Sequence, residues 1–377
     1  MKKSIQTCIC FIKKETVLCI AALLALCSAF FVPPSLHYLE YLDLRVLSLL
    51  FCLMLVVAGL QSIGVFQMLG TTLLSGTKNT RQLVLLLTGL CFFSSMLITN
   101  DVSLITFVPF AIMILHMADQ DNLLIPVIVL QTIAANLGSM FTPVGNPQNL
   151  YLYSAYSIPI ADFLLAMLPL TLLSLVLLAA AAFLLPNEEL SLQTLSGTKA
   201  QLSRKKLLVY LALFLVCLAC VIHLITFPWM ILIVTICIFL VDRSLFKDAD
   251  YFLLLTFVCF FLFIGNMERI PAIATLLRNL IRQRELFLGI LASQCISNVP
   301  AAILLSGFTD QAIPLLYGVN IGGLGTLIAS LASLISYRYY VNLKGAKKGK
   351  YFRTFTFYNL VFLLLIGFAG YLLLKIQ

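Results

Sequence analysis

The chain alternates between long apolar stretches and short polar connections. A helix needs about 20 predominantly apolar residues to cross the hydrocarbon core of a bilayer. By this criterion the pattern predicts nine full-length crossings, at residues 15–33, 43–62, 122–143, 158–186, 206–224, 226–242, 250–267, 311–336 and 354–376. The pattern therefore predicts an all-α polytopic membrane protein.

The apolar stretch over residues 285–309 does not fit a crossing. Ser297, Asn298 and Pro300 interrupt it near the middle and leave arms of 11 and 8 residues. Neither arm is long enough to span a bilayer, so we predict a re-entrant helical hairpin with the Ser-Asn pair at its tip.

Residues 82–118 carry a matching pair, Thr99-Asn100, inside a longer apolar stretch. The longer arms permit two ordinary spans joined by a surface turn, whereas the repetition of the motif favours a first hairpin here. Shorter apolar stretches at residues 64–75 and 269–281 precede the two hairpins, and we expect both to be helices lying on the membrane surface.

A second motif, Asn-x-Gly-x-x-x-Thr, also occurs once in each half. Its members are Asn136, Gly138 and Thr142 in the first half, and Asn320, Gly322 and Thr326 in the second. The first copy continues as TPVGNPQN, whose prolines and glycine are expected to unwind the helix at a functional site, with a surface loop as the alternative. The second copy lacks the prolines, so we expect that helix to be only kinked.

Composition agrees with a membrane protein, because 62% of the 377 residues are hydrophobic and 10% are charged. The net charge of +9 comes from lysines and arginines in the connections, so it sets orientation and does not indicate nucleic-acid binding. Their distribution predicts a cell-membrane protein with a cytoplasmic N-terminus and an external C-terminus. The 11 cysteines are scattered through apolar segments and are expected to pack rather than to bind metal.

The two halves are predicted to be repeats of inverted topology. Each has four crossings and one hairpin, and the unpaired helix at 206–224 reverses the direction of the second copy. The predicted domains are residues 1–186 (first repeat), 187–224 (cytoplasmic linker and inverting helix) and 225–377 (second repeat). The two hairpin tips are then expected to meet near the midplane of the membrane.

The hairpin tips and the unwound segments are the candidate binding site. Helix ends offer free backbone groups, and Ser, Thr and Asn offer neutral oxygens and amides, so together they can hold an anion beside a cation. Ser95 and Ser293 each lie five residues before the Asn of a tip, and matched spacing lets both contribute to one cation site in each half. Hydrogen bonding back to their own helix is the alternative.

Asp101 is the only one of the 15 carboxylates that lies deep within a hydrophobic stretch. An intramembrane carboxylate is energetically costly and is by default a functional residue. Asp101 could accept a coupling proton, ligate a cation, or cap the helical arm that follows it. Val299 holds the equivalent position in the second half, so the two tips are chemically unequal.

These motifs resemble those of the ion-transporter superfamily that contains divalent anion–sodium symporters, citrate-transporter-like permeases, arsenite efflux permeases and NhaD-type sodium/proton antiporters. The resemblance spans most of both halves and is most specific at TND (99–101), TPVGNPQN (142–149), SNVP (297–300) and NIGGLGT (320–326). The symporters carry Ser-Asn-Thr at both tips, where this chain has Asp101 and Val299 in place of Thr. The Asn-Asp and Asn-x-Pro forms look closer to the arsenite branch, and GNPQN looks closer to the carboxylate branch.

The resemblance implies a secondary transporter with an elevator-like motion, not an enzyme, without a cofactor and usually a homodimer. It implies a small anionic substrate, foremost a di- or tricarboxylate such as citrate, coupled to Na⁺ or H⁺. Efflux of arsenite or another inorganic oxyanion, Na⁺/H⁺ antiport and an anion channel are the alternatives. The implied substrate-binding residues are Thr99, Asn100, Asp101, Thr142, Asn146, Ser297, Asn298 and Thr326. The implied residues for cation or proton coupling are Ser95, Asn100, Asp101, Gly145, Ser293, Asn298 and Ala329.

Overall fold

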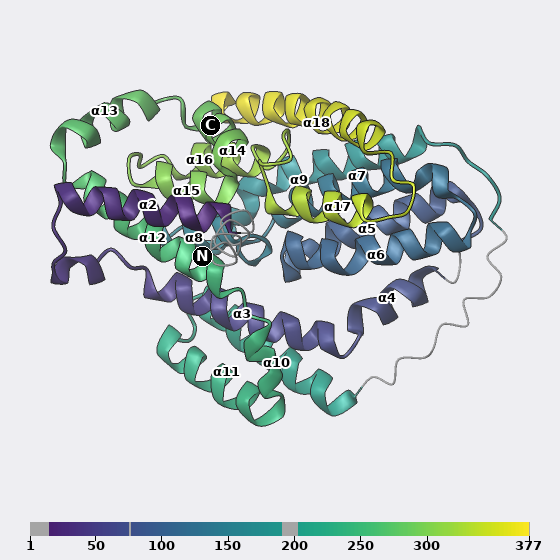
Figure 1. Ribbon diagram of the computed structural model, residues 1–377, viewed down its shortest axis with the longest axis horizontal. Coiled ribbons are helices and arrows are strands. Elements are labelled where there is room, and N and C mark those ends of the chain that lie inside the picture. The colour runs from purple at the N-terminus through teal and green to yellow at the C-terminus, as the bar shows by residue number, and fades with distance from the viewer. Residues whose placement is uncertain (1–14, 75–76, 191–202, 377) are drawn as a thin grey trace, which may run out of the picture.

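The computed structural model describes residues 15–74, 77–190 and 203–376, which form helices and turns without a β-sheet (Figure 1). The helices of the first half are α2 (Thr16–Phe31), α3 (Leu44–Ser62), α4 (Val65–Leu74), α5 (Thr80–Ile98), α6 (Asn100–Met117), α7 (Leu124–Ser139), α8 (Pro147–Ala155) and α9 (Ile160–Phe183). Helix α10 (Arg204–Val221) follows. The helices of the second half are α11 (Phe227–Val241), α12 (Tyr251–Glu268), α13 (Pro271–Ile281), α14 (Glu285–Ile296), α15 (Asn298–Ser306), α16 (Ala312–Ile321), α17 (Leu331–Val341) and α18 (Lys348–Ile376). The short 3₁₀ turns are η1 (Leu36–Leu39), η2 (Asp121–Leu123), η3 (Pro143–Gly145) and η4 (Arg243–Lys247).

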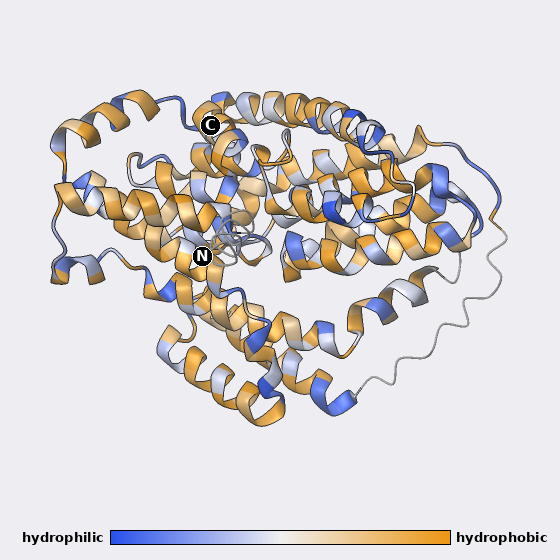
Figure 2. Ribbon diagram, viewed as in Figure 1, coloured by the Kyte–Doolittle hydropathy of each residue, from blue (hydrophilic) through white to orange (hydrophobic). Residues whose placement is uncertain are grey.

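Helix length and composition confirm a polytopic membrane protein. Seven of the described helices are long and apolar enough to cross a membrane: α3, α5, α6, α7 with its preceding turn, α9, α12 and α18. Figure 2 shows apolar residues along most of each helix, and polar residues mainly at helix ends and in the connections. The predicted crossings at the positions of α2, α3, α9, α10, α11, α12 and α18 agree with these helices to within a few residues.

One predicted crossing is wrong. Residues 311–336 do not form a continuous helix, because α16 ends at Ile321 and α17 begins at Leu331. The chain between them is unwound, not merely kinked as the missing prolines suggested. Three glycines lie in this interval, and Gly325 has a φ of +106°, which a helical residue cannot adopt. Glycine residues therefore interrupt the helix in the second half, as proline residues do in the first.

Both predicted hairpins are present as antiparallel helix pairs. The second pairs α14 with α15, whose 12 and 9 residues are too short to cross a bilayer. The first pairs α5 with α6, which are longer, but their junction is not a surface turn because Asn100 is only 4% exposed. The alternative of a surface turn at residues 99–100 is therefore excluded.

The packing of the two halves is reciprocal. Helix α2 of the first half packs along α12 of the second, and α11 of the second packs against α3 of the first. In the same way α6 packs on α17, and its counterpart α15 packs on α8. Helix α10 has no counterpart and lies against α3. This exchange brings the two hairpins against each other's unwound segments.

The predicted surface helices correspond to α4 and α13, which lie toward opposite ends of the long axis of the molecule (Figure 1). Their position on the membrane surface stays a prediction, as do the inverted orientation of the repeats and the domain boundaries. Part of the predicted linker, residues 191–202, lies outside the described residues.

Candidate functional site

The two hairpins turn at equivalent residues with the same strained backbone. Thr99 has φ 69° and ψ 150°, and Ser297 has φ 73° and ψ 155°. This region is essentially restricted to glycine, and a residue with a side chain there costs about 1–3 kcal/mol. Both residues end one helix and begin the next within a single position. Strain of this kind, repeated at both tips, is typical of a functional site.

The Asn that follows each turn folds back onto the start of the next helix. Asn100 Oδ1 accepts a hydrogen bond from the Asp101 amide at 2.9 Å, and Asn298 Oδ1 accepts one from the Val299 amide at 3.0 Å. The side-chain oxygen thus satisfies a backbone N–H that has no partner within the helix. This explains why both tips carry Asn directly after the strained residue.

Each unwound segment is attached to the first arm of its own hairpin by a threonine. Thr142 Oγ1 donates to the Met96 carbonyl, and Thr326 Oγ1 donates to the Gln294 carbonyl at 3.3 Å. Both carbonyls belong to the residue three positions before the strained turn. The two threonines therefore fasten the unwound segments to the hairpins and do not line the cavity described below.

The first unwound segment is buried, which confirms unwinding inside the protein and excludes a surface loop. Asn149 Nδ2 donates to the carbonyls of Ser139, Met140 and Thr142 at 3.2–3.3 Å. A Cβ on Gly145 would lie 2.2 Å from the Ser139 carbonyl oxygen, so the close approach of the chain at this point requires glycine. The Asn149 side-chain amide thus satisfies carbonyl groups that have no partner within a helix, and Gly145 allows the chain to approach closely enough for this arrangement.

The two halves meet at Asn136. Its Oδ1 accepts hydrogen bonds from Asn100 Nδ2 at 3.0 Å and from Ser330 Oγ at 2.9 Å. Nearby, the backbone N–H of Asn298 donates to the Ala329 carbonyl at 3.0 Å. These bonds join the first hairpin tip to α7 and to the second unwound segment, and join the second hairpin tip to that same segment. The tips are therefore brought together as the repeated motifs predicted.

A small cavity lies between the tips. Its volume is about 10 Å³, which is close to the space that one water molecule needs. The lining residues are Asn100, Asp101, Asn146, Pro147, Gln148, Leu253, Asn298, Val299, Ser330 and Leu331. The helices α6, α8, α15 and α17 all begin at this cavity, so their N-terminal ends direct partial positive charge toward it.

Several buried polar atoms at this cavity have no hydrogen-bond partner. They are Asp101 Oδ1, Asn146 Oδ1, and both amide atoms of Gln148. Buried polar groups are normally paired, and an unpaired group is energetically costly unless a ligand satisfies it. The absence of a partner for Asp101 Oδ1 also argues against helix capping as the role of that atom. Gln148 was not among the predicted site residues, although it lies within the TPVGNPQN motif.

A larger pocket of about 440 Å³ opens onto the same place and shares Asp101, Asn146, Pro147 and Leu253 with the small cavity. Thr99, Asp248 and Asp250 also line it, and no lysine or arginine of the described residues does. Asp248 and Asp250 follow the first tip by more than a hundred residues and precede the second tip by about fifty, and no sequence signal identified them. Within the described part of the chain, the charged residues that line the route to the tips are therefore all carboxylates.

The remaining predicted coupling residues lie behind the cavity. Ser95 and Ser293 are buried, and their hydroxyls donate to carbonyls of their own helices, at Phe92 (2.9 Å) and Gly289 (2.7 Å). Each serine faces a motif glycine, because a Cβ on Gly138 would lie 2.8 Å from Ser95 Oγ and one on Gly322 would lie 2.6 Å from Ser293 Oγ. The alternative reading of these serines, bonding back to the helix, describes the observed contacts.

Replacing Gly138 with Ala is expected to destabilise the protein. The added Cβ would lie 2.1 Å from the Phe92 carbonyl oxygen, so α5 and α7 would have to separate. Overpacking of a buried helix contact costs about 1–3 kcal/mol or more, and the melting temperature of the purified protein should fall. Gly89→Ala on α5 is the matched control, because its Cβ would meet nothing within 4 Å. Equal melting temperatures for the two variants would contradict this account of the contact.

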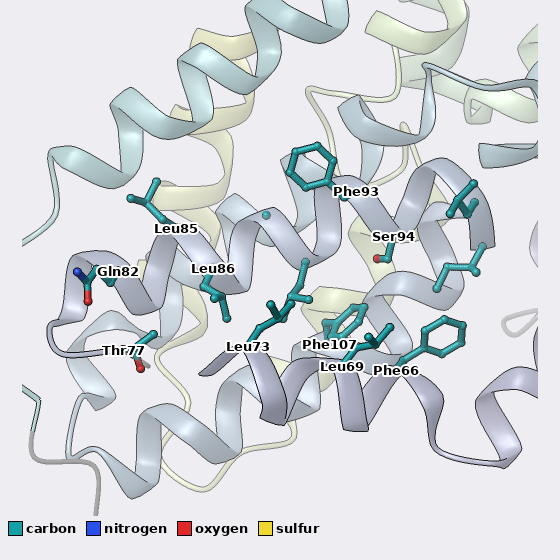
Figure 3. Close-up of a pocket in the computed structure, with 14 residues that line it drawn as sticks. Phe66, Leu69, Leu73, Thr77, Gln82, Leu85, Leu86, Phe93, Ser94 and Phe107 are labelled. Carbon is teal, nitrogen blue, oxygen red and sulfur yellow. The ribbon is translucent and has the colours of Figure 1, made fainter. Parts of the chain in front are cut away.

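A more voluminous cavity lies elsewhere. It has a volume of about 830 Å³ and is formed mainly by α4 and α5. Figure 3 shows Leu69 and Leu73 of α4 on the side of α5 toward which Leu86 points, with Phe107 of α6 nearby. This apolar lining suits hydrocarbon and offers few partners for a polar solute. We therefore assign the polar site to the hairpin tips and not to this apolar cavity.

Comparisons with known proteins give similarities to membrane transporters. The family model described as "Citrate transporter" (CitMHS) matches residues 8–311. The chain is 36% identical over 267 residues to the uncharacterized transporter MJ0456 of Methanocaldococcus jannaschii, covering 69% of this chain and 72% of that protein. It is 32% identical over 336 residues to the inner membrane protein YbiR of Escherichia coli, covering 86% of each. It is 35% identical over 129 residues to the silicon efflux transporter LSI3 of Oryza sativa subsp. japonica, covering 34% of this chain and 26% of that protein.

Proposed function

This chain is a membrane transporter that belongs to the citrate transporter family, and on that basis we propose that it is a secondary active transporter of a small oxygen-rich acid. The leading substrate class is a di- or tricarboxylate such as citrate, with Na⁺ or H⁺ as the coupling ion. The observation that carries the proposal is the convergence of both hairpin tips and both unwound segments on one cavity with unpaired polar atoms.

The cavity offers groups suited to an acid without burying a protein cation. Four helices begin there, and helix N-terminal ends bind carboxylate and other oxyanions through free N–H groups and the helix dipole. The Gln148 amide nitrogen has no partner and can donate to a substrate oxygen, and the Asn146 oxygen can accept from a hydroxyl group. A hydroxylated carboxylic acid would use both kinds of group.

Asp101 is the residue to which we assign coupling. Among the residues that the structure describes, it is the only carboxylate that lines the space between the tips, and none of their basic side chains lines that space or the adjoining pocket. A bound cation or a proton would compensate its charge in a region of low dielectric. Either would also reduce the repulsion between Asp101 and an anionic substrate, which links loading of the ion to loading of the substrate.

Transport requires the tips to separate. A cavity of about 10 Å³ holds one water molecule and not citrate, so the state described here is closed around the binding groups. The pocket of about 440 Å³ reaches these groups from one side, and we assign it as the access route in this state. An elevator-like displacement of the hairpins relative to the rest of the protein would open the route on the other side.

A second candidate substrate is a neutral hydroxylated acid of an inorganic element, exported rather than taken up. Of the described charged residues, Asp101, Asp248 and Asp250 line the access pocket and no basic residue does, an arrangement that repels anions and tolerates neutral solutes. The similarity to a silicon efflux transporter, although it covers a third of this chain, points the same way. Arsenite in its neutral form belongs to the same chemical class. Na⁺/H⁺ antiport at Asp101, without a second solute, is the remaining alternative.

Transport by the purified protein in proteoliposomes would distinguish these functions. We expect labelled citrate or succinate to accumulate against its gradient when an inward gradient of Na⁺ or H⁺ is imposed, and not when the gradient is collapsed. Flux that only runs downhill would identify a channel. Transport of silicic acid or arsenite without transport of carboxylates would identify the second candidate, and Na⁺/H⁺ exchange alone would identify an antiporter. Empty liposomes and protein with Asp101→Asn serve as controls.

A further inference from the structure

A separate basic cavity lies at the far end of the helices that hold the transport site. It has a volume of about 420 Å³ and lies between the start of α7 and the connection from α17 to α18. Its polar lining comes from His116, Asp121, Asn122, Tyr340, Lys344, Lys347 and Lys350. It shares no lining residue with the cavity between the tips or with the access pocket.

The charge of this cavity is not neutralised within the described part of the chain. Asp121 is its only carboxylate, and that group is paired with His116. No carboxylate among the described residues lies within salt-bridge distance of Lys344, Lys347 or Lys350. Three lysines therefore line a concave space, and none of them is paired with a carboxylate of the described residues.

The backbone adds to this positive potential and fixes the shape of the cavity. Helix α18 begins at Lys348 at its edge, and Leu124 and Ile125 at the start of α7 form part of its wall. Both helix ends present N–H groups and partial positive charge. The Tyr340 hydroxyl accepts a hydrogen bond from the Lys347 backbone amide at 3.0 Å, and the Tyr340 ring stacks on that of Tyr351 with 4.9 Å between the ring centroids. These contacts hold the connection from α17 to α18 in place.

We propose that this cavity binds the phosphodiester headgroup of an anionic phospholipid. Lysine ammonium groups and helix N-terminal ends are the groups that bind phosphate oxygens. A lipid is indicated as the source because Lys350 lies in the first turn of α18, a candidate membrane span whose exposed face is apolar. Phe357, Leu364 and Phe368 on that face are each 63–64% exposed. Acyl chains can therefore lie along α18 while the headgroup occupies the cavity.

The position of the cavity connects it to transport. Helix α7 runs from the cavity to Asn136 and the first unwound segment, roughly 24 Å for its 16 residues. Helix α17 begins next to Ser330 in the second unwound segment and ends at the cavity. A headgroup held between their far ends would keep the two helices in one relative position, and with them the two unwound segments.

Binding is tested with phosphatidylglycerol as the probe. The melting temperature of the purified full chain in detergent is measured with added phosphatidylglycerol, phosphatidylcholine or inorganic phosphate, and retained lipid is counted by native mass spectrometry. We expect phosphatidylglycerol alone to raise the melting temperature and to remain bound. The triple variant Lys344→Gln, Lys347→Gln, Lys350→Gln should weaken this binding by roughly 100-fold, given the contribution of each lysine near an anionic lipid.

The matched control is Arg278→Gln, Arg282→Gln, Arg284→Gln, which removes the same charge from the last turn of α13 and the connection that follows it. This variant should keep the full response to phosphatidylglycerol. An equal response in both triple variants, or an equal response to phosphatidylcholine, would overturn the site. A full response to inorganic phosphate would overturn the lipid as ligand and identify a soluble anion. All three lysines are exposed, and the single variant Lys344→Gln provides a milder change with a smaller loss in the same direction.

Discussion

Asp101→Asn is expected to abolish ion-driven accumulation of the substrate while leaving folded protein in the membrane. Asparagine has nearly the same shape, and Asp101 Oδ1 makes no hydrogen bond that the change would remove. The variant cannot bind a proton at this position, and it loses the negative charge that would attract a cation. Substrate should then equilibrate across the membrane without concentrating, whatever the gradient imposed.

The measurement compares accumulation in proteoliposomes with and without the ion gradient, at several pH values. If H⁺ is the coupling ion, the wild-type rate should depend on pH and the rate of the variant should not. If Na⁺ is the coupling ion, the dependence on Na⁺ concentration should be lost instead. An unchanged dependence on both ions would remove Asp101 from the coupling mechanism.

Asp248→Asn is the matched control for this experiment. Asp248 lines the same access pocket and the substitution is the same, but the residue is exposed and does not line the space between the tips. We expect Asp248→Asn to change the apparent affinity for the substrate through the field of the pocket and to leave ion coupling intact. Asp250 is less suitable, because its Oδ1 accepts a hydrogen bond from the Leu253 amide and caps α12.

Asn136→Leu is expected to cause the second large effect, a loss of both stability and transport. Asn136 Oδ1 is the acceptor for Asn100 Nδ2 and for Ser330 Oγ, which come from different halves of the chain. Leucine has no acceptor atom and would leave both donors unpaired, and each buried unsatisfied donor costs about 1–3 kcal/mol. A combined loss of roughly 2–6 kcal/mol is a large part of the stability of a typical protein.

Thermal unfolding and size-exclusion chromatography of the purified protein measure this loss, and proteoliposome uptake measures its consequence for transport. Asn359→Leu on α18 is the control, because Asn359 is equally buried but its Nδ2 bonds only to the Phe355 carbonyl of its own helix. That variant should stay close to wild type in stability. Comparable losses in the two variants would mean that Asn136 has no special part in joining the halves.

Much of the local structure follows from local sequence. Apolar length predicts α3, α9, α12 and α18 to within a few residues, because burial in lipid requires a minimum helical length. The polar pairs at Thr99-Asn100 and Ser297-Asn298 predict both hairpin turns, because polar side chains and broken backbone at membrane depth require partners inside the protein. The repetition of these pairs also predicts that the tips act together.

Other features depend on segments that are far apart in the chain. The sequence predicts only a kink at residues 322–330, whereas the structure shows an unwound segment. Glycine lowers the stability of a helix without forbidding it, so tertiary packing decides whether the helix continues. Thr142 and Thr326 belong to the predicted site, but their hydroxyls attach the unwound segments to the hairpins. Residue spacing does not predict the direction in which a hydroxyl points from an irregular segment, because such a segment has no regular periodicity.

The sequence alone determined the apolar helices, the two broken hairpins and Asp101 as the unmatched carboxylate between them, because each depends on the cost of placing neighbouring residues in lipid. Only the tertiary structure decided that Asn136 joins the halves, that Gln148 faces the cavity with an unpaired amide, and that Asp248 and Asp250 line its approach. These depend on the reciprocal packing of helices from opposite halves, which fixes distances between side chains that no local pattern encodes.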